Sequence, residues 1–207
     1  MSTDAFFSLP RTTRPVDWFE TILPKLGLRL PQQTLEIAMA YHVIGAGGGT
    51  WTVLLQNGRP VTQKGVAGNV VAHLSMSAGH FREAIAGALR ERLGSALQRL
   101  GKAKELPDMS RQIIDAKRLA AVAAIAGSVA IVLHDKHFGD TYRYVLTMGG
   151  NSPDYDKAQA TIEVDLDDLL ALAVARTPPL QMLVSGKLKL HGDTGLPQRW
   201  LLALLGK

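Results

Sequence analysis

The pattern of hydrophobic and polar residues is clearest near the end of the chain. In residues 187–191 leucines alternate with lysine and histidine, which is typical of a strand with one buried and one exposed face. Residues 192–195 interrupt the alternation, and Asp193 or Thr194 can cap the helix that follows. From 196 to 204 apolar residues recur at helical spacing. The pattern therefore predicts a short strand followed by an amphipathic terminal helix.

Stretches in the first half of the chain are similar to stretches in the second half at a nearly constant separation. The matching pairs are 50–58 with 141–149, 72–81 with 160–169, and 101–104 with 186–189. A constant separation over several motifs indicates an internal repeat. We therefore interpret the chain as a tandem duplication, with one unit at 1–108 and a second, better preserved unit at 109–207.

The sequence pattern predicts the same order of elements in each unit. The order is a helix, a two-stranded hairpin, a third strand, one or two helices, a last strand and a closing helix. In the first unit these are a helix at about 15–26, strands at 35–44, 51–56 and 70–75, and a helix from Ala78. In the second unit they are a helix at about 110–126, strands at 129–135, 142–148 and 160–164, and a helix from Leu166. The last strand of the first unit, at 101–108, is expected to be degenerate, because Glu105 occupies a core-facing position and Pro107 cannot donate to a sheet ladder.

The sequence Gly186-Lys187-Leu188-Lys189-Leu190-His191-Gly192-Asp193, with the apolar helix after it, resembles the hallmark of the sterol carrier protein 2 (SCP2-like) lipid-binding family. The strand and helix start at 160–172 are similar to a second signature of that family. The resemblance is strong over 160–205 and moderate elsewhere. It implies an α+β fold in which an antiparallel or mixed β-sheet is covered by helices on one face, in two tandem units.

The resemblance also implies an elongated hydrophobic cavity between the sheet and the helices, closed by the C-terminal helix. The residues expected to line it are apolar side chains of the second unit. They are Leu169, Leu172, Leu180, Met182, Leu183, Leu188, Leu190, Trp200, Leu201 and Leu204. A methionine suits a pocket that accepts varied lipid chains, because its thioether side chain repacks easily. The alternative is that these side chains fill an ordinary packed core with no ligand.

The function that the resemblance implies is the binding or intracellular transfer of a hydrophobic small molecule, such as a fatty acyl, sterol-like or prenyl lipid. No cofactor and no catalytic role are expected. The alternative is a non-catalytic interaction or dimerisation module, or an accessory factor in a lipid-biosynthetic complex. A carrier should purify with a lipid, whereas such a module should show a stable partner or self-association.

The motifs that point to other chemistry are weak. The chain has no cysteine, which excludes disulfides, thiolate metal sites and cysteine nucleophiles. Gly45-Ala46-Gly47-Gly48-Gly49 favours a hairpin turn over a dinucleotide-binding loop, because a strand and not a helix follows it. His134 and His137 favour a surface turn over a metal site, because no third ligand lies nearby. The remaining histidines, at 42, 73, 80 and 191, are predicted to be isolated.

The formal net charge is +5, and the lysines and arginines are spread along the chain with one denser run. This run consists of Arg90, Arg92, Arg99, Lys102, Lys104, Arg111, Lys117 and Arg118. It predicts either a solvated face of two helices or a surface that contacts anionic membrane lipids. Nucleic-acid binding is not expected, because aromatic residues do not interleave with the basic ones. The absence of a signal-peptide pattern, of cysteine and of a peroxisomal C-terminus predicts a cytoplasmic protein.

Overall fold

The computed structural model describes residues 9–25, 37–57, 59–92, 95, 116–173 and 179–205. Inside helices it describes the backbone but not the side chains of residues 116, 117, 119, 172, 173, 179, 180, 204 and 205. The predicted degenerate strand at 101–108 and the boundary between the predicted units therefore lie outside the described residues.

The first half begins with a helical segment that includes a π-helical turn. Its parts are α2 (Pro15–Asp17), η1 (Trp18–Ile22) and α3 (Leu23–Lys25). The strands and the helix after them are β1 (Ile37–Ile44), β2 (Gly49–Gln56), β3 (Arg59–Lys64), β4 (Val70–Ser77) and α4 (Ala78–Ala86). The predicted elements of this half are confirmed where they are described, but β3 was not predicted.

The second half contains every element that the sequence predicts for it. These are α7 (Ala116–Ala123), β5 (Gly127–Asp135), β6 (Asp140–Met148), β7 (Ala160–Asp165), α8 (Leu166–Ala173), α9 (Pro179–Val184), β8 (Leu188–Gly192) and α10 (Gly195–Leu205). The helix α8 begins directly after β7, with Asp167 and Asp168 in its first turn, where carboxylates favour the positive end of the helix dipole.

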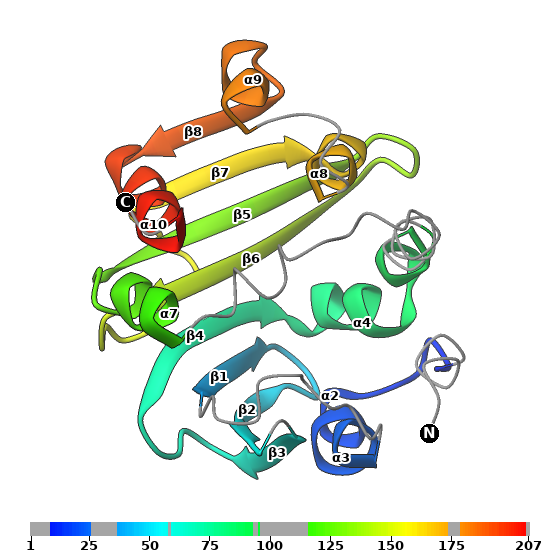
Figure 1. Ribbon diagram of the computed structural model, residues 1–207. Coiled ribbons are helices and arrows are strands. Elements are labelled where there is room, and N and C mark those ends of the chain that lie inside the picture. The colour runs from blue at the N-terminus through cyan, green and yellow to red at the C-terminus, as the bar shows by residue number, and fades with distance from the viewer. Residues whose placement is uncertain are drawn as a thin grey trace.

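The strands form one mixed sheet of eight strands in the order β3-β2-β1-β4-β6-β5-β7-β8 (Figure 1). In each half a hairpin is antiparallel, β1 with β2 and β5 with β6, and its first strand pairs in parallel with a later strand, β4 or β7. The two halves join through the antiparallel pair β4 and β6. The fold is therefore α+β, and the same strand arrangement occurs twice within one continuous sheet.

The strand pairing can be compared with the predicted repeat. Leu74 pairs with Tyr41 in the first half, and Ile162, which the sequence match aligns with Leu74, pairs with Ile131 in the second. The partner of Tyr41 on β2 is Trp51, whereas the partner of Ile131 on β6 is Tyr144, two residues beyond the position that the sequence match predicts. The repeated topology agrees with a duplication in outline, and common ancestry of the halves stays a prediction.

The unpredicted strand β3 has a local cause. Asn57-Gly58 is a strong signal for a two-residue hairpin turn, and Asn57 has the positive φ of 52° that such turns require. Pro60 weakens the strand signal because proline has no N–H to donate, but β3 is an edge strand, where proline is tolerated.

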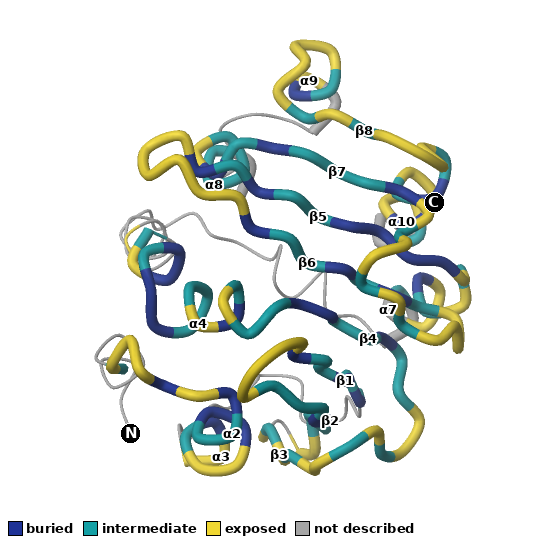
Figure 2. The backbone as a smooth tube through the Cα atoms, turned by 180° about the vertical axis from the view of Figure 1, so that it is seen from behind, coloured by how far each residue is buried: buried dark blue, intermediate teal, exposed yellow. Residues whose placement is uncertain are grey.

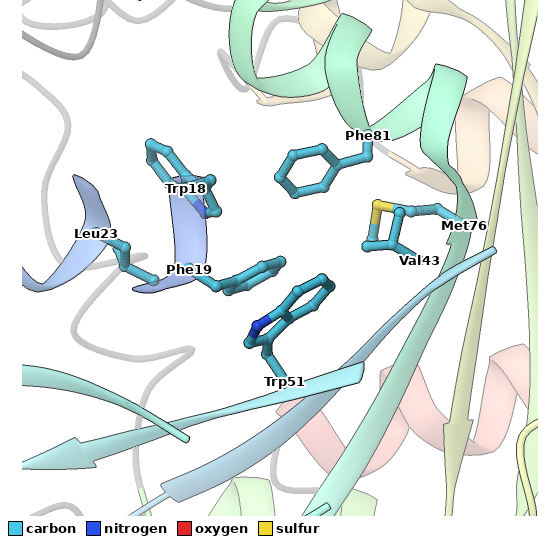
Figure 3. Packing of buried hydrophobic residues seen from close by; sticks show 7 residues of the cluster. All are labelled: Trp18, Phe19, Leu23, Val43, Trp51, Met76 and Phe81. Atoms are coloured by element: carbon cyan, nitrogen blue, oxygen red, sulfur yellow. The ribbon is translucent and has the colours of Figure 1, made fainter. Parts of the chain in front are cut away.

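Helices α7, α8 and α10 cover one face of the sheet, in front of the strands in Figure 1 and behind them in Figure 2. The apolar side chains gather on this face in three clusters. The first, in the N-terminal half, is aromatic and brings together Trp18, Phe19, Leu23, Val43, Trp51, Met76 and Phe81 (Figure 3). Phe19 stacks on Trp51 with 4.9 Å between ring centroids, which fixes the first helical segment on β2.

Candidate functional site

Four predicted lining residues, Leu169, Met182, Leu188 and Trp200, lie in two apolar clusters built mainly from the second half. The α8–α9 cluster consists of Leu89, Leu133, Tyr142, Val164, Leu166 and Met182, with Leu169 and Leu188 packed against it. The α7–α10 cluster consists of Val122, Val129, Ala160, Leu196 and Trp200. The side chains of Leu172, Leu180 and Leu204 lie outside the described part of the chain.

The other predicted residues are less buried. Leu183 and Leu190 are half-buried, and Leu190 shares the helix-covered face of the sheet with Leu188. Leu201 is 43% exposed on the outer side of α10, beside Leu202 at 48%. Leu201 therefore points away from the sheet in this conformation.

The α7–α10 cluster is fixed by directional contacts. The indole Nε1 of Trp200 donates a hydrogen bond of 3.1 Å to the carbonyl of Ile125, beyond the end of α7. Leu196 packs so closely that a Cβ on Gly127, whose φ is +154°, would lie 2.5 Å from it. Asp193 caps α10, since its Oδ1 accepts from the backbone N–H groups of Gly195 at 3.1 Å and Leu196 at 3.2 Å. Trp200 is thus an anchor of α10.

The α8–α9 cluster is assembled from more distant parts of the chain. Met182 of α9 is fully buried, and Leu166 at the start of α8 is 1% exposed. Leu89, which is 2% exposed, comes from the first half of the chain. Lys187, directly before the edge strand β8, forms an ion pair of 2.6 Å with Asp168 of α8.

A polar groove of about 600 Å³ lies at the ends of β5 and β7. Its described lining is His134, Asp135, Lys136, Gly139, Asp140, Thr141, Glu163, Val164, Asp165, Asp168, Gly186, Lys187 and Lys189, and it contains none of the predicted lining residues. Val164 belongs both to this lining and to the α8–α9 cluster. The sequence did not suggest the groove, because its charged residues come from separate strands and turns that only the pairing of β5 with β6 and β7, and of β7 with β8, brings together.

The histidines are not isolated, which corrects the sequence prediction. His42 Nε2 lies 2.9 Å from His73 Nδ1, because β1 and β4 pair in parallel, and Thr50 Oγ1 lies 3.3 Å from His42 Nδ1. Burial and the neighbouring His73 lower the pKa of His42, and burial lowers the pKa of His73. Within the described ranges no three His, Asp or Glu side chains are arranged to hold a metal ion.

Glu163 brings two other histidines together. His134 Nε2 lies 3.7 Å from one oxygen of Glu163, and His191 Nε2 lies 3.5 Å from the other. All three side chains project from neighbouring strands, β5, β7 and β8. His134 is therefore a strand residue paired across the sheet, whereas the turn begins after it.

Two members of the predicted basic run are not on a free surface. Arg90 is 6% exposed, and its guanidinium donates to the carbonyl of Leu9 at 3.1 Å. Arg92 forms ion pairs with Asp135 and Asp167. Arg99, Lys102, Lys104 and Arg111 lie outside the described residues, so the run as a whole is not tested as a membrane-binding surface.

Asp135 is a buried carboxylate with specific partners. Burial alone would raise its pKa, but hydrogen bonds from Arg92 and from the backbone N–H groups of His137 and Phe138 hold the pKa below its ordinary value. Asp135 is therefore ionised, and Arg92 supplies the charge that compensates it.

The part of the chain that carries both clusters and the groove can be compared with known families. Residues 107–201 match the SCP-2 sterol transfer family. This SCP-2 match spans α7, all strands from β5 to β8, and most of α10. It therefore covers most of the predicted second unit, whereas the first half of the chain lies outside it. No curated protein matches the chain.

Several solved structures show a distant likeness. Sterol carrier protein 2 like 2 from Aedes aegypti has 16% identity and a TM-score of 0.35, over 56% of this chain and 97% of that chain. Sterol carrier protein 2 from Yarrowia lipolytica, in its apo form, has 18% identity and a TM-score of 0.33, over 45% and 82%. The inverting sec-alkylsulfatase Pisa1 from Pseudomonas sp. has 14% identity and a TM-score of 0.26, over 41% and 14%. At these TM-scores the likeness assigns neither fold nor function.

Within the described ranges every helix is too short or too polar to cross a lipid bilayer.

Proposed function

We propose that this chain binds and carries a hydrophobic small molecule, such as a fatty acyl, sterol-like or prenyl lipid, and that it is a carrier and not an enzyme. The observation that carries the proposal is the match of residues 107–201 to the SCP-2 sterol transfer family. The apolar face under α8, α9 and α10 supports it, because it supplies the buried surface that such a ligand needs.

The α8–α9 cluster is the better position for the ligand. Three predicted lining residues, Leu169, Met182 and Leu188, meet there. Through Val164 the cluster adjoins the polar groove, where a ligand's polar end could stay hydrated. The α7–α10 cluster is less suitable, because the hydrogen bond between Trp200 and Ile125 would have to break to make room.

The driving force is the removal of the ligand's apolar surface from water. Each buried CH₂ group gains about 0.8 kcal/mol, so a chain segment of about eight such groups gains about 6 kcal/mol before the costs of association. As a net free energy, about 6 kcal/mol would be a dissociation constant of tens of micromolar, and the costs of association make the binding of such a segment weaker than that. A fully enclosed lipid would bind more tightly.

The proposal is tested on protein purified from cells. Native mass spectrometry followed by lipid extraction should show a co-purifying lipid, and a fluorescent fatty acid should bind saturably. We expect Met182→Phe to weaken that binding at least tenfold, because the larger ring occupies the ligand's volume. Val184→Phe is the matched control, since Val184 is 84% exposed on the same helix.

Two outcomes would contradict this function or this site. Protein that carries no lipid and binds no probe, but forms a stable complex with itself or with another protein, would favour an interaction module instead. Unchanged binding in a folded Met182→Phe variant would remove the ligand from the α8–α9 cluster.

Release at a membrane is part of the same proposal. Leu201 and Leu202 give α10 an outward apolar edge, which suits contact with the interfacial region of a bilayer. Flotation of the protein with anionic vesicles measures that contact. Action in the cytoplasm stays a prediction from the sequence.

A further inference from the structure

A short helical segment of the first half reaches over the second half. Residues 88–92 are helical and follow α4 after a break at Gly87. Glu83 folds back across this break, and its Oε2 accepts a 2.9 Å hydrogen bond from the N–H of Ala88. A Cβ at position 87 would lie 2.0 Å from the same oxygen and 2.8 Å from the Cα of Glu83, so glycine at this position lets Glu83 fold back over the break. Gly87 therefore joins two helical pieces at a point with little room for a side chain.

The segment has separate attachments to the two halves. Toward the first half, Arg90 donates to the carbonyl of Leu9 at 3.1 Å, and Glu91 pairs with Arg11 at 3.5 Å. Toward the second half, Leu89 packs in the α8–α9 cluster, and Arg92 contacts carboxylates of two elements. The segment is thus held by contacts with both halves.

Arg92 bridges the two sides of the α8–α9 cluster. One guanidinium nitrogen donates to Asp135 Oδ1 at the end of β5, and the other donates to Asp167 Oδ1 in the first turn of α8. The side chain of Asp135 is fully buried, whereas that of Asp167 is 78% exposed. Leu89, almost one helical turn before Arg92, lies in the cluster that also contains Leu166 and Met182.

We propose that residues 88–92 are a lid, supplied by the first half of the chain, over the ligand site in the α8–α9 cluster, and that Arg92 is its latch. This inference rests on the function proposed above. In Figure 1 the chain after α4 rises toward α8 and the β5–β6 turn, in agreement with the Arg92 contacts. Lifting the segment about Gly87 removes Leu89 from the cluster and breaks the two Arg92 ion pairs. It also breaks the contacts of Arg90 and Glu91 with Leu9 and Arg11. The latch therefore sets the rate of ligand entry and exit.

The test measures exchange rates as well as affinity. Stopped-flow mixing of the whole protein with a fluorescent fatty acid gives the association and dissociation rates. We expect Asp167→Asn, which removes the exposed half of the latch, to raise both rates about threefold. The double variant Arg92→Met with Asp135→Asn removes the whole latch without leaving a buried charge unpaired, and should raise both rates at least tenfold. The dissociation constant should change less than threefold in each case.

Arg199→Met is the matched control, because Arg199 pairs with Asp193 at 3.2 Å on α10, away from the segment. Hydrogen exchange of the backbone N–H groups at 84–92 provides a readout that needs no ligand, and it should accelerate in the latch variants only.

The outcomes separate the two proposals. If the unmodified protein binds the probe but the folded latch variants exchange it at the same rates, the lid is wrong and the carrier function stands. If the unmodified protein binds no probe, the carrier function is contradicted and the lid with it. Faster exchange in Arg199→Met as well would show a general loosening of the fold and would also overturn the latch.

Discussion

The contact between His42 and His73 depends on how their strands pair in the sheet. The two histidines are 31 residues apart in sequence, yet the parallel pairing of β1 with β4 brings their ring nitrogens to 2.9 Å. A hydrogen bond between two imidazoles requires that one ring donates and the other accepts, so at least one ring of the pair is neutral. Burial lowers the pKa of both side chains, which favours the neutral form of each ring.

This pair predicts a loss of stability in mild acid. Because both folded pKa values lie below the ordinary value of 6.5, the unfolded chain takes up protons first as the pH falls. The pair's contribution to the free energy of unfolding is therefore complete above pH 6.5 and is lost as the pH falls through the folded pKa values. Urea denaturation at several pH values should show a weaker pH dependence in the His42→Gln, His73→Gln double variant.

His137→Gln is the comparison for that experiment, since His137 lies in the exposed turn after β5. It should keep the pH dependence of the unmodified protein. An equally steep dependence in the double variant would show that other groups cause the acid effect.

The terminal strand and helix are elements that the sequence predicted well. The alternation at 187–191 and the apolar spacing from 196 onward correspond to β8 and α10. The sequence left two candidates for the cap of α10, Asp193 and Thr194. In the structure Asp193 is the cap, because its carboxylate accepts hydrogen bonds from two backbone N–H groups and pairs with Arg199. Thr194 is exposed.

The cap gives a direct stability test. Asp193→Ala should lower the free energy of unfolding by about 1 kcal/mol, because the first N–H groups of α10 lose their acceptor. Thr194→Ala should change it by less than about 0.5 kcal/mol, as is usual for exposed positions. Chemical denaturation of both variants measures the difference, and equal effects would contradict the role of Asp193.

Elements with strong local signals could be predicted, and those with conflicting signals could not. The strands and helices of the second half have long apolar patterns and clear ends. Strand β3 was not predicted, and its local signals conflict, since Pro60 follows the turn signal at 57–58 and only the edge position of the strand makes the proline acceptable. Boundaries such as the start of β5 at Gly127 were displaced by two residues, since glycine carries no apolar signal.

At the scale of the molecule, the two predicted units share one sheet. The pair β4 and β6 continues the hydrogen-bonded ladder across the point where separate domains would part. The α8–α9 cluster also crosses it, through Leu89. The candidate site could be predicted only in part, because the sequence identified apolar residues of the second half but gave no sign that the first half contributes to the same cluster.

This continuity predicts cooperative unfolding. Far-ultraviolet circular dichroism and tryptophan fluorescence, which reports on Trp18, Trp51 and Trp200 from both halves, should follow one transition with one midpoint. Two transitions with distinct midpoints would show that the halves unfold separately, and would support the predicted division at 108.

The order of the strands has a consequence for the protein during its synthesis. Strand β4 leaves the ribosome well before β6, its partner on one side, so one row of its N–H and C=O groups has no strand to bind for that time. Unpaired edges of this kind promote aggregation of nascent chains. We therefore expect the yield of folded protein to depend on how fast residues 140–148 follow, and chaperones that shield exposed strands to raise it.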